Sequence, residues 1–85
     1  MTAREYLKRA ASIAYLETYK YLDVWTVMHE AAGFDAAAIP DEAYDALAVA
    51  LGKVSLTEWD REPRHRDEVG AMFERAAAAV TEPTP

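Results

Sequence analysis

Cysteine is absent from this 85-residue chain, and glycine and proline are scarce, with three and four residues. Without cysteine, the chain forms neither disulfides nor thiolate metal sites. Gly33, Gly52 and Gly70 lie too far apart to form a phosphate-cradling loop, which argues against a nucleotide site. No stretch approaches the roughly 18 consecutive apolar residues of a membrane span, and the first residues lack the apolar core of a signal peptide. We therefore expect a soluble, cytoplasmic protein.

The remaining composition is typical of a folded globular protein. Hydrophobic residues make up 52% of the chain and charged residues 28%, close to the averages for soluble domains. A chain of this length supports one hydrophobic core rather than two. We expect a single helical domain over residues 1–80 and a flexible tail over residues 81–85.

Helix breakers divide the chain into blocks at Gly33, Pro40, Gly52 and Pro63. Apolar residues recur within these blocks at the three- and four-residue spacing of amphipathic helices, and no segment shows the alternation of a strand. We predict an all-α bundle of three main helices, over residues 2–32, 41–51 and 63–80, with a short helix near 56–61.

Local signals support several helix ends. Asp41 and Glu42 follow a proline and suit the positive end of a helix. Ser55 and Glu58 have the spacing of a capping box at the start of the short helix. Gly33 is placed to end the first helix in the left-handed conformation.

The first block, residues 2–32, contains no glycine or proline and carries several aromatic residues. On a helical projection Tyr21, Trp25 and Met28 fall on the face expected to be buried. A helix of about 31 residues would be roughly 46 Å long, whereas a domain of this size is about 30 Å across. Either the block bends into two helices, or another chain covers the part that its own short helices do not reach.

Three apolar residues favour the second of these explanations. Leu16, Tyr19 and Val27 fall within the otherwise polar sector of the first helix, so we expect them to form a partner interface together with Tyr15 and Glu17. Glu17 itself falls on the apolar side. It either contacts Lys20 or Tyr21 at the edge of that face or acts as a polar registration point in an oligomer interface.

Negative charge is concentrated in the middle of the chain. The formal net charge is −6, and residues 21–62 contain nine acidic side chains against two basic ones. Such a segment repels nucleic acid and attracts basic protein surfaces. An alternative hypothesis is therefore an acidic inhibitor, for instance a phage-encoded DNA mimic, that occupies a basic nucleic-acid-binding surface. Its expected acidic face consists of Asp41, Glu42, Asp45, Glu58, Asp60 and Glu62.

Residues 47–57 resemble the helix-turn-helix of phage-repressor-like regulators. They read as a helix that ends at Gly52, followed by a second helix capped by Ser55. The resemblance implies a DNA-binding regulator as a second alternative. The segment in the place of the recognition helix, residues 56–62, is acidic and ends at Pro63, which makes it unsuited to a major groove.

The sequence contains only weak matches to motifs for metal binding or catalysis. Glu62 and His65 have the Glu-x-x-His spacing of di-iron bundles, but a di-iron site requires two such motifs and the chain has one. His29 is better explained as a cation favoured near a helix C-terminus than as a general base. We expect no catalysis, metal, cofactor or small-molecule substrate. The leading hypothesis is a small acidic interaction module that self-associates or binds a protein partner through its aromatic first helix.

Overall fold

The computed structural model describes residues 1–80 and is mostly helical, which confirms the all-α prediction. In chain order its elements are α1 (Ala3–Leu16), β1 (Tyr21–Leu22), α2 (Val24–Ala31), the 3₁₀ turn η1 (Ala36–Ala38), α3 (Asp41–Leu51), α4 (Leu56–Trp59), β2 (Arg64–His65) and α5 (Arg66–Ala79). The tail predicted over residues 81–85 lies outside the described residues.

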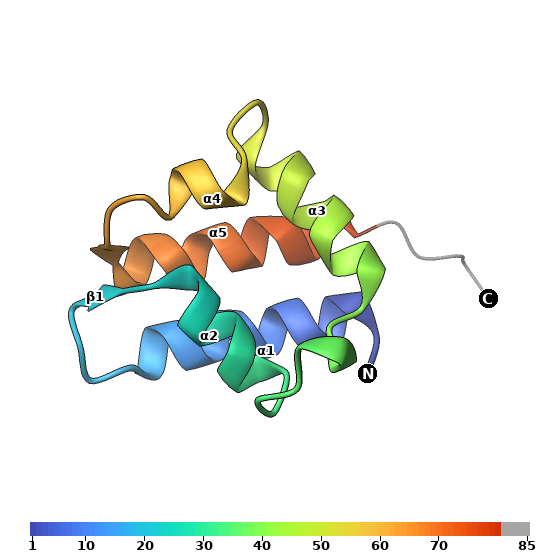
Figure 1. The fold of residues 1–85 in the computed structure, drawn as a ribbon, viewed down its shortest axis with the longest axis horizontal. Coiled ribbons are helices and arrows are strands. Elements are labelled where there is room, and N and C mark those ends of the chain that lie inside the picture. The colour runs from blue at the N-terminus through green and yellow to red at the C-terminus, as the bar shows by residue number, and fades with distance from the viewer. Residues whose placement is uncertain (81–85) are drawn as a thin grey trace.

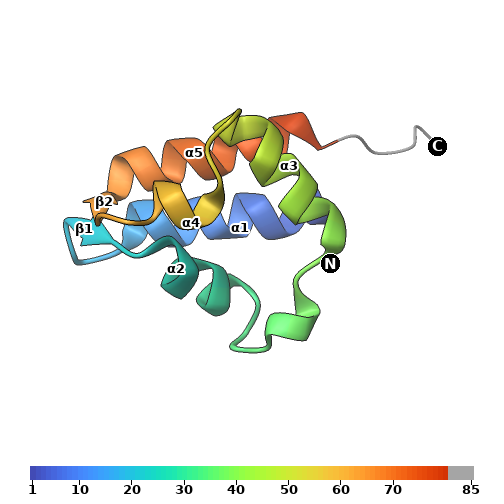
Figure 2. The ribbon, with the colours of Figure 1, turned by 45° about the horizontal axis from the view of Figure 1, so that its top comes forward.

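α1 and α5 run side by side in opposite directions and make the most extensive contact between helices (Figure 1, Figure 2). Ala10 and Ala14 of α1 and Met72 and Phe73 of α5 are all completely buried. α3 crosses one end of this pair, and α2 packs against α1. The largest fully buried side chains are Tyr6, Phe73, Leu7, Met28, Leu47, Met72, Val24 and Val69.

Of the two alternatives considered for residues 2–32, the structure shows the bend, because the block forms α1 and α2 with an extended segment between them. The backbone becomes extended at Glu17, where ψ is 143°. The threonine and tyrosines that follow have low helix propensity. Asp23 then starts a new helix, since its Oδ1 accepts a hydrogen bond from the backbone N–H of Trp25 at 3.0 Å. α1 has 14 residues, about 21 Å, so the bend removes the excess length.

The bend also changes which aromatic residues are covered. Met28 is fully buried as predicted, but Tyr21 is 61% exposed and Trp25 is 38% exposed. The helical projection assumed a constant 100° per residue across residues 17–23, and the extended backbone there breaks that phase. The prediction that Tyr21 and Trp25 belong to the core is therefore wrong.

A short antiparallel strand pair closes the end of the molecule opposite α3, and the sequence analysis missed it. Tyr21 pairs with His65, and Leu22 pairs with Arg64. The last helix consequently begins at Arg66 instead of at residue 63, and Nδ1 of His65 caps it by accepting the N–H of Asp67 at 3.1 Å. His65 and Asp67 also lie within ion-pair range, at 3.7 Å, but the cap requires an unprotonated Nδ1, so we regard the ring as neutral in this geometry.

The other helix boundaries follow the local signals closely. α3 spans the predicted residues 41–51. Ser55 caps α4 as expected, with its Oγ accepting the N–H of Glu58 at 3.1 Å, although α4 ends at Trp59 and not at residue 61. Gly33 has a φ of 66°, which confirms its left-handed role after α2.

We expect Tyr6→Phe to lower the free energy of unfolding by about 1 kcal/mol. The Tyr6 hydroxyl is buried and donates a hydrogen bond to the carbonyl oxygen of Met28 at 3.0 Å. Burial also raises the pKa of this hydroxyl well above its ordinary value. The loss is moderate because the Met28 carbonyl still accepts the N–H of Ala32. Urea denaturation measures the effect, with the exposed Tyr19→Phe as control; equal stability of the two variants would contradict it.

Candidate functional site

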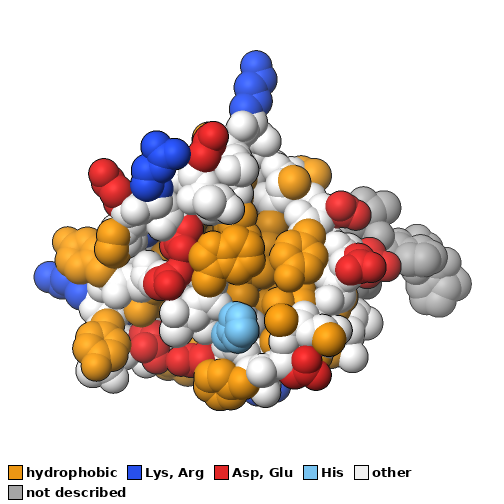
Figure 3. Space-filling view, in the orientation of Figure 1, with side chains coloured by type: hydrophobic (Ala, Val, Ile, Leu, Met, Phe, Trp, Pro, Cys, Tyr) orange, Lys and Arg blue, Asp and Glu red, His pale blue; other side chains and the backbone are white. Residues whose placement is uncertain are grey.

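Exposed apolar side chains gather where α1 ends and β1 begins. Leu16 is 84% exposed and Tyr19 is 72% exposed, and Tyr21 follows two residues later. Figure 3 shows apolar side chains around β1, at the left of the molecule. We call Leu16, Tyr19 and Tyr21 the aromatic corner. Leu16 and Tyr19 were predicted from the sequence as partner residues, whereas Tyr21 was predicted as core.

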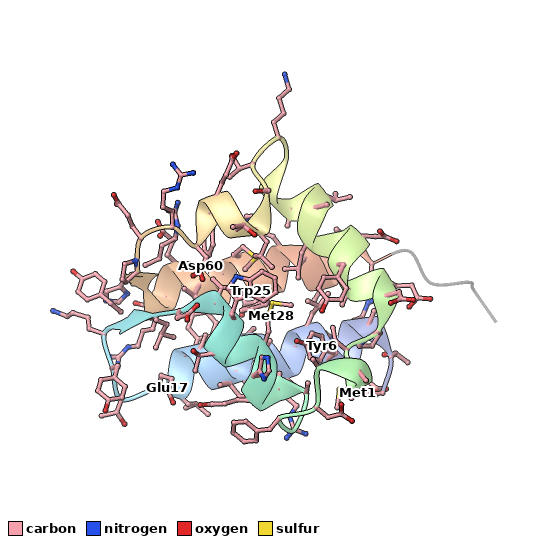
Figure 4. All side chains as sticks on the ribbon, viewed as in Figure 1. Met1, Tyr6, Glu17, Trp25, Met28 and Asp60 are labelled. Carbon is pink, nitrogen blue, oxygen red and sulfur yellow. The ribbon has the colours of Figure 1, made fainter. Side chains whose placement is uncertain are left out.

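A hollow of about 220 Å³ adjoins the aromatic corner. It is lined by Glu17, Tyr19, Tyr21, Leu22, Asp23, Thr26, Val27 and Glu30. Because three of these side chains are carboxylates, we call it the acidic hollow. Figure 4 labels Glu17 at the end of α1.

Val27 lines this hollow but is only 2% exposed. The bend places α2 against α1 and turns Val27 toward the core, so its predicted position on an outward sector is wrong. Val27 supports the hollow from within the fold and offers a partner almost no surface. Of the predicted partner residues that line the hollow, Glu17 and Tyr19 are therefore the ones that a partner could contact.

Glu17 and Tyr21 both line the hollow, and the role of Glu17 as a registration point in an oligomer interface stays a prediction. Glu17 is the half-buried C-cap residue of α1, where the helix ends. Within residues 1–80, no lysine or arginine side chain lies within salt-bridge distance of Glu17 or Glu30. The contact between Glu17 and Lys20 is thus not formed as an ion pair, and two of the three carboxylates of the hollow, those of Glu17 and Glu30, have no cationic partner from the described chain.

Hydrogen bonds from α5 fasten the loop that carries the aromatic corner. Nη1 of Arg66 donates to the carbonyl oxygen of Glu17 at 2.7 Å and lies 3.5 Å from that of Thr18. The backbone N–H of Arg66 donates to the carbonyl oxygen of Lys20 at 2.8 Å. Carbonyls at a helix C-terminus lack intrahelical partners and carry partial negative charge, so a guanidinium is favoured there. The loop is held in place by residues that the sequence analysis did not select.

Two carboxyl groups meet at the start of α2. Oδ1 of Asp60 accepts the N–H of Val24 at 2.9 Å, beside the capping carboxylate of Asp23, and Figure 4 labels Asp60 near Trp25. Burial and the hydrogen bond to Asp23 raise the pKa of Asp60 to about 6, and the same hydrogen bond lowers the pKa of Asp23. The pair therefore shares one proton in weakly acidic solution.

We expect Asp60→Asn to stabilise the protein at pH 7.5 and to leave its stability unchanged near pH 4. The folded-state pKa of about 6 lies above the unfolded value of about 3.9. Protonated Asp60 therefore stabilises the fold fully at a pH below its unfolded-state pKa, and this stabilisation is lost as the pH rises through 6. Partial exposure reduces the effect to about 1 kcal/mol.

Thermal unfolding at the two pH values measures this difference. The asparagine keeps an oxygen for the Val24 N–H and adds a donor toward Asp23. Asp45→Asn, an exposed substitution on α3, is the matched control and should not change the pH dependence. An Asp60→Asn variant less stable than the wild type at pH 7.5 would contradict the shared proton.

Tyr15, the remaining predicted partner residue, lies apart from the acidic hollow. Its ring packs over Gly70 of α5, where a Cβ atom would come within 2.6 Å of the ring. Tyr15 lines a wider groove of about 660 Å³ between α1 and α5, together with Arg4, Lys8 and Glu74. Burial and the Glu74 carboxylate raise the pKa of the Tyr15 hydroxyl. The predicted partner residues thus divide between two surfaces.

The six residues of the predicted acidic face do not form one surface. Asp41, Glu42 and Asp45 are exposed at the start of α3. The other three lie on α4 and the turn after it, and Asp60 is directed inward. Figure 3 shows acidic side chains in separate groups near these elements. α4 has only four residues, about 6 Å of helix, too short for the recognition helix that the helix-turn-helix resemblance implies.

A second exposed aromatic surface was also missed. Trp25 lies near the centre of the face seen in Figure 4, and Figure 3 shows apolar surface extending from it toward α3, where Tyr44 is half-exposed. The sequence contained a local signal for the start of α2, because Asp is a favoured N-cap residue and Asp23 stands at that position, with Thr26 at N3. Such a residue favours a helix start inside residues 2–32, but by itself it does not distinguish a bent block from a continuous helix.

Comparisons with known proteins find no matching family model, no similar curated protein and no similar solved structure. Within residues 1–80, no group of three histidine, aspartate or glutamate side chains is arranged to hold a metal ion. None of the helices there is both long and apolar enough to cross a membrane. Inferences about function therefore rest on the surfaces described above.

Proposed function

We propose that this chain is a small protein-interaction module that binds a protein partner through the aromatic corner and the adjoining acidic hollow. It acts by binding and not by catalysis. The observation that carries the proposal is the exposure of Leu16, Tyr19 and Tyr21 on the segment from the end of α1 to β1, which Arg66 fastens. Of the five partner residues first selected from the sequence, the proposal retains Leu16, Tyr19 and Glu17, omits Tyr15 and the buried Val27, and adds Tyr21.

Exposed tyrosines on an ordered loop are well suited to binding. Tyrosine offers a large amphipathic contact area at a low cost in conformational entropy, and it is enriched among residues that dominate binding energy. A partner that meets a loop held by Arg66 does not have to order it, which lowers the cost of association. A standard interface of about 800 Å² per partner would cover roughly a seventh of the 5417 Å² surface of this chain.

Site-specific photo-crosslinking in the native host tests the proposal. A benzophenone amino acid replaces Tyr19 in the full chain, and the same substitution at Lys53, exposed in the turn between α3 and α4, is the matched control. We expect a discrete covalent adduct from position 19 and none from position 53. An adduct of twice the mass of the chain would identify a second copy as the partner.

A second substitution, made in the chain that carries the benzophenone at position 19, tests the contribution of Tyr21. Tyr21→Ala should reduce the adduct yield from position 19 about tenfold if Tyr21 contributes as an interface hot spot. Circular dichroism verifies that each variant folds. The same benzophenone replacement is also made at positions 16 and 21. Absence of adducts from positions 16, 19 and 21 alike, or identical adducts from position 53, would overturn the proposed function.

A further inference from the structure

We propose that the partner inserts an arginine side chain into the acidic hollow, between the carboxylates of Glu17 and Glu30 and the rings of Tyr19 and Tyr21. This inference rests on the proposed function and specifies the chemistry of the partner. The aromatic corner provides the apolar contact, and the hollow beside it selects a cation. The partner segment therefore presents an arginine next to apolar side chains.

The charge around the hollow favours a cation over any other occupant. Glu17, Asp23 and Glu30 all line it, and the described chain supplies no ion pair to Glu17 or Glu30. Arg66, which contacts the same loop, directs its donors to backbone carbonyl oxygens and not to these carboxylates. A positively charged partner group would thus meet carboxylates that the fold leaves uncompensated, which steers association and sets specificity.

The aromatic walls favour a guanidinium in particular. A guanidinium stacks on aromatic faces and hydrogen-bonds carboxylates in a planar fork, whereas an ammonium is a compact and strongly hydrated charge. The Tyr21 ring is braced by the His65 ring, which meets it edge-on at 82° with the centroids 6.0 Å apart. One wall of the hollow is therefore positioned before the partner arrives.

The size and charge of the hollow argue against other occupants. A volume of about 220 Å³ is below the range of about 300–1,000 Å³ that is usual for small-molecule and cofactor sites, but it accommodates one long side chain. Two copies joined hollow to hollow would bring the three carboxylates of one toward those of the other, and in any other arrangement each copy still carries a net charge of −6, so like charges disfavour self-association. A different, cationic protein is the better fit.

Binding of a model arginine side chain tests the inference directly. The probes are Nα-acetyl-arginine methylamide and its neutral isostere Nα-acetyl-citrulline methylamide, each titrated into the isotope-labelled full chain and followed by NMR. We expect saturable shifts of the Tyr21, Thr26 and Glu30 amides with the arginine probe, and at least tenfold weaker binding of the citrulline probe. Added salt should weaken the arginine binding, because the hollow is open to solvent.

Charge-neutralising variants locate the site. Glu30→Gln should weaken binding of the arginine probe about threefold, and the double variant with Glu17→Gln about tenfold, which are the effects of partly exposed ion pairs. Glu42→Gln, an exposed substitution on α3, is the matched control and should change nothing. Equal binding of the two probes, or an equal loss in the Glu42→Gln variant, would overturn the inference.

The crosslinking experiment separates this inference from the proposed function. Adducts from Tyr19 without any preference for the arginine probe would overturn the arginine site and leave the interaction module intact. Arginine binding without adducts from positions 16, 19 and 21 would instead overturn the proposed function. When both hold, the crosslinked segment of the partner should contain an arginine beside the site of attachment, and a segment without arginine would overturn the inference.

Discussion

Phe73→Ala is expected to lower the free energy of unfolding by about 3–5 kcal/mol, the range for removal of a fully buried aromatic ring. Phe73 is completely buried on α5, in the interface with α1 that forms the centre of the core. A domain of this length has a total stability of roughly 4–13 kcal/mol. The substitution therefore removes a large part of the stability, and a shift of roughly 4–8 °C in the melting temperature accompanies each kcal/mol.

Calorimetry and urea denaturation measure this loss. Phe73→Leu keeps most of the buried volume and is the matched control, with an expected loss of about 1–1.5 kcal/mol. Ala78→Gly, at an exposed position of the same helix, should cost about 1 kcal/mol through helix propensity alone. An alanine variant at position 73 that is no less stable than the leucine variant would show that the packing between α1 and α5 is not the main source of stability.

Arg66→Met is expected to lower the free energy of unfolding by about 2 kcal/mol, the usual value for a hydrogen bond that involves a charged group. The methionine keeps an aliphatic side chain but removes the donors that reach the carbonyl oxygens of Glu17 and Thr18. These carbonyls lie at the C-terminal end of α1 and lose a favourable cation. The pairing of Tyr21 with His65 should weaken as the loop loosens.

Amide hydrogen exchange separates this local effect from global destabilisation. The amide of Leu22, which faces β2 in the hydrogen-bonded pair with Arg64, should lose protection by a larger factor than the amides of α3. Arg66→Lys should recover less than half of the stability, since a single ammonium cannot reproduce the planar guanidinium fork. Arg61→Met, exposed in the turn after α4, is the control. Unchanged protection at Leu22 in Arg66→Met would mean that the strand pair, and not the guanidinium, fastens the loop.

Much of the helical organisation could be read from the sequence, because helix ends depend on contacts within about four residues. The bounds of α3, the cap at Ser55 and the left-handed Gly33 are all of this kind. The candidate site was only partly accessible. Leu16 and Tyr19 were selected from the helical projection, although the projection assumed a continuous helix that does not exist.

The sequence by itself determined the fold class, most helix boundaries and the excess of negative charge around the middle of the chain. Only the tertiary structure decided that the aromatic first block bends, that Tyr21 faces solvent while Val27 is buried, and that three carboxylates border two tyrosines. The physical reason is the range of the interactions. The contact of Val24 with Asp60 spans 36 residues and that of Glu17 with Arg66 spans 49, whereas helical periodicity reports only on neighbouring turns.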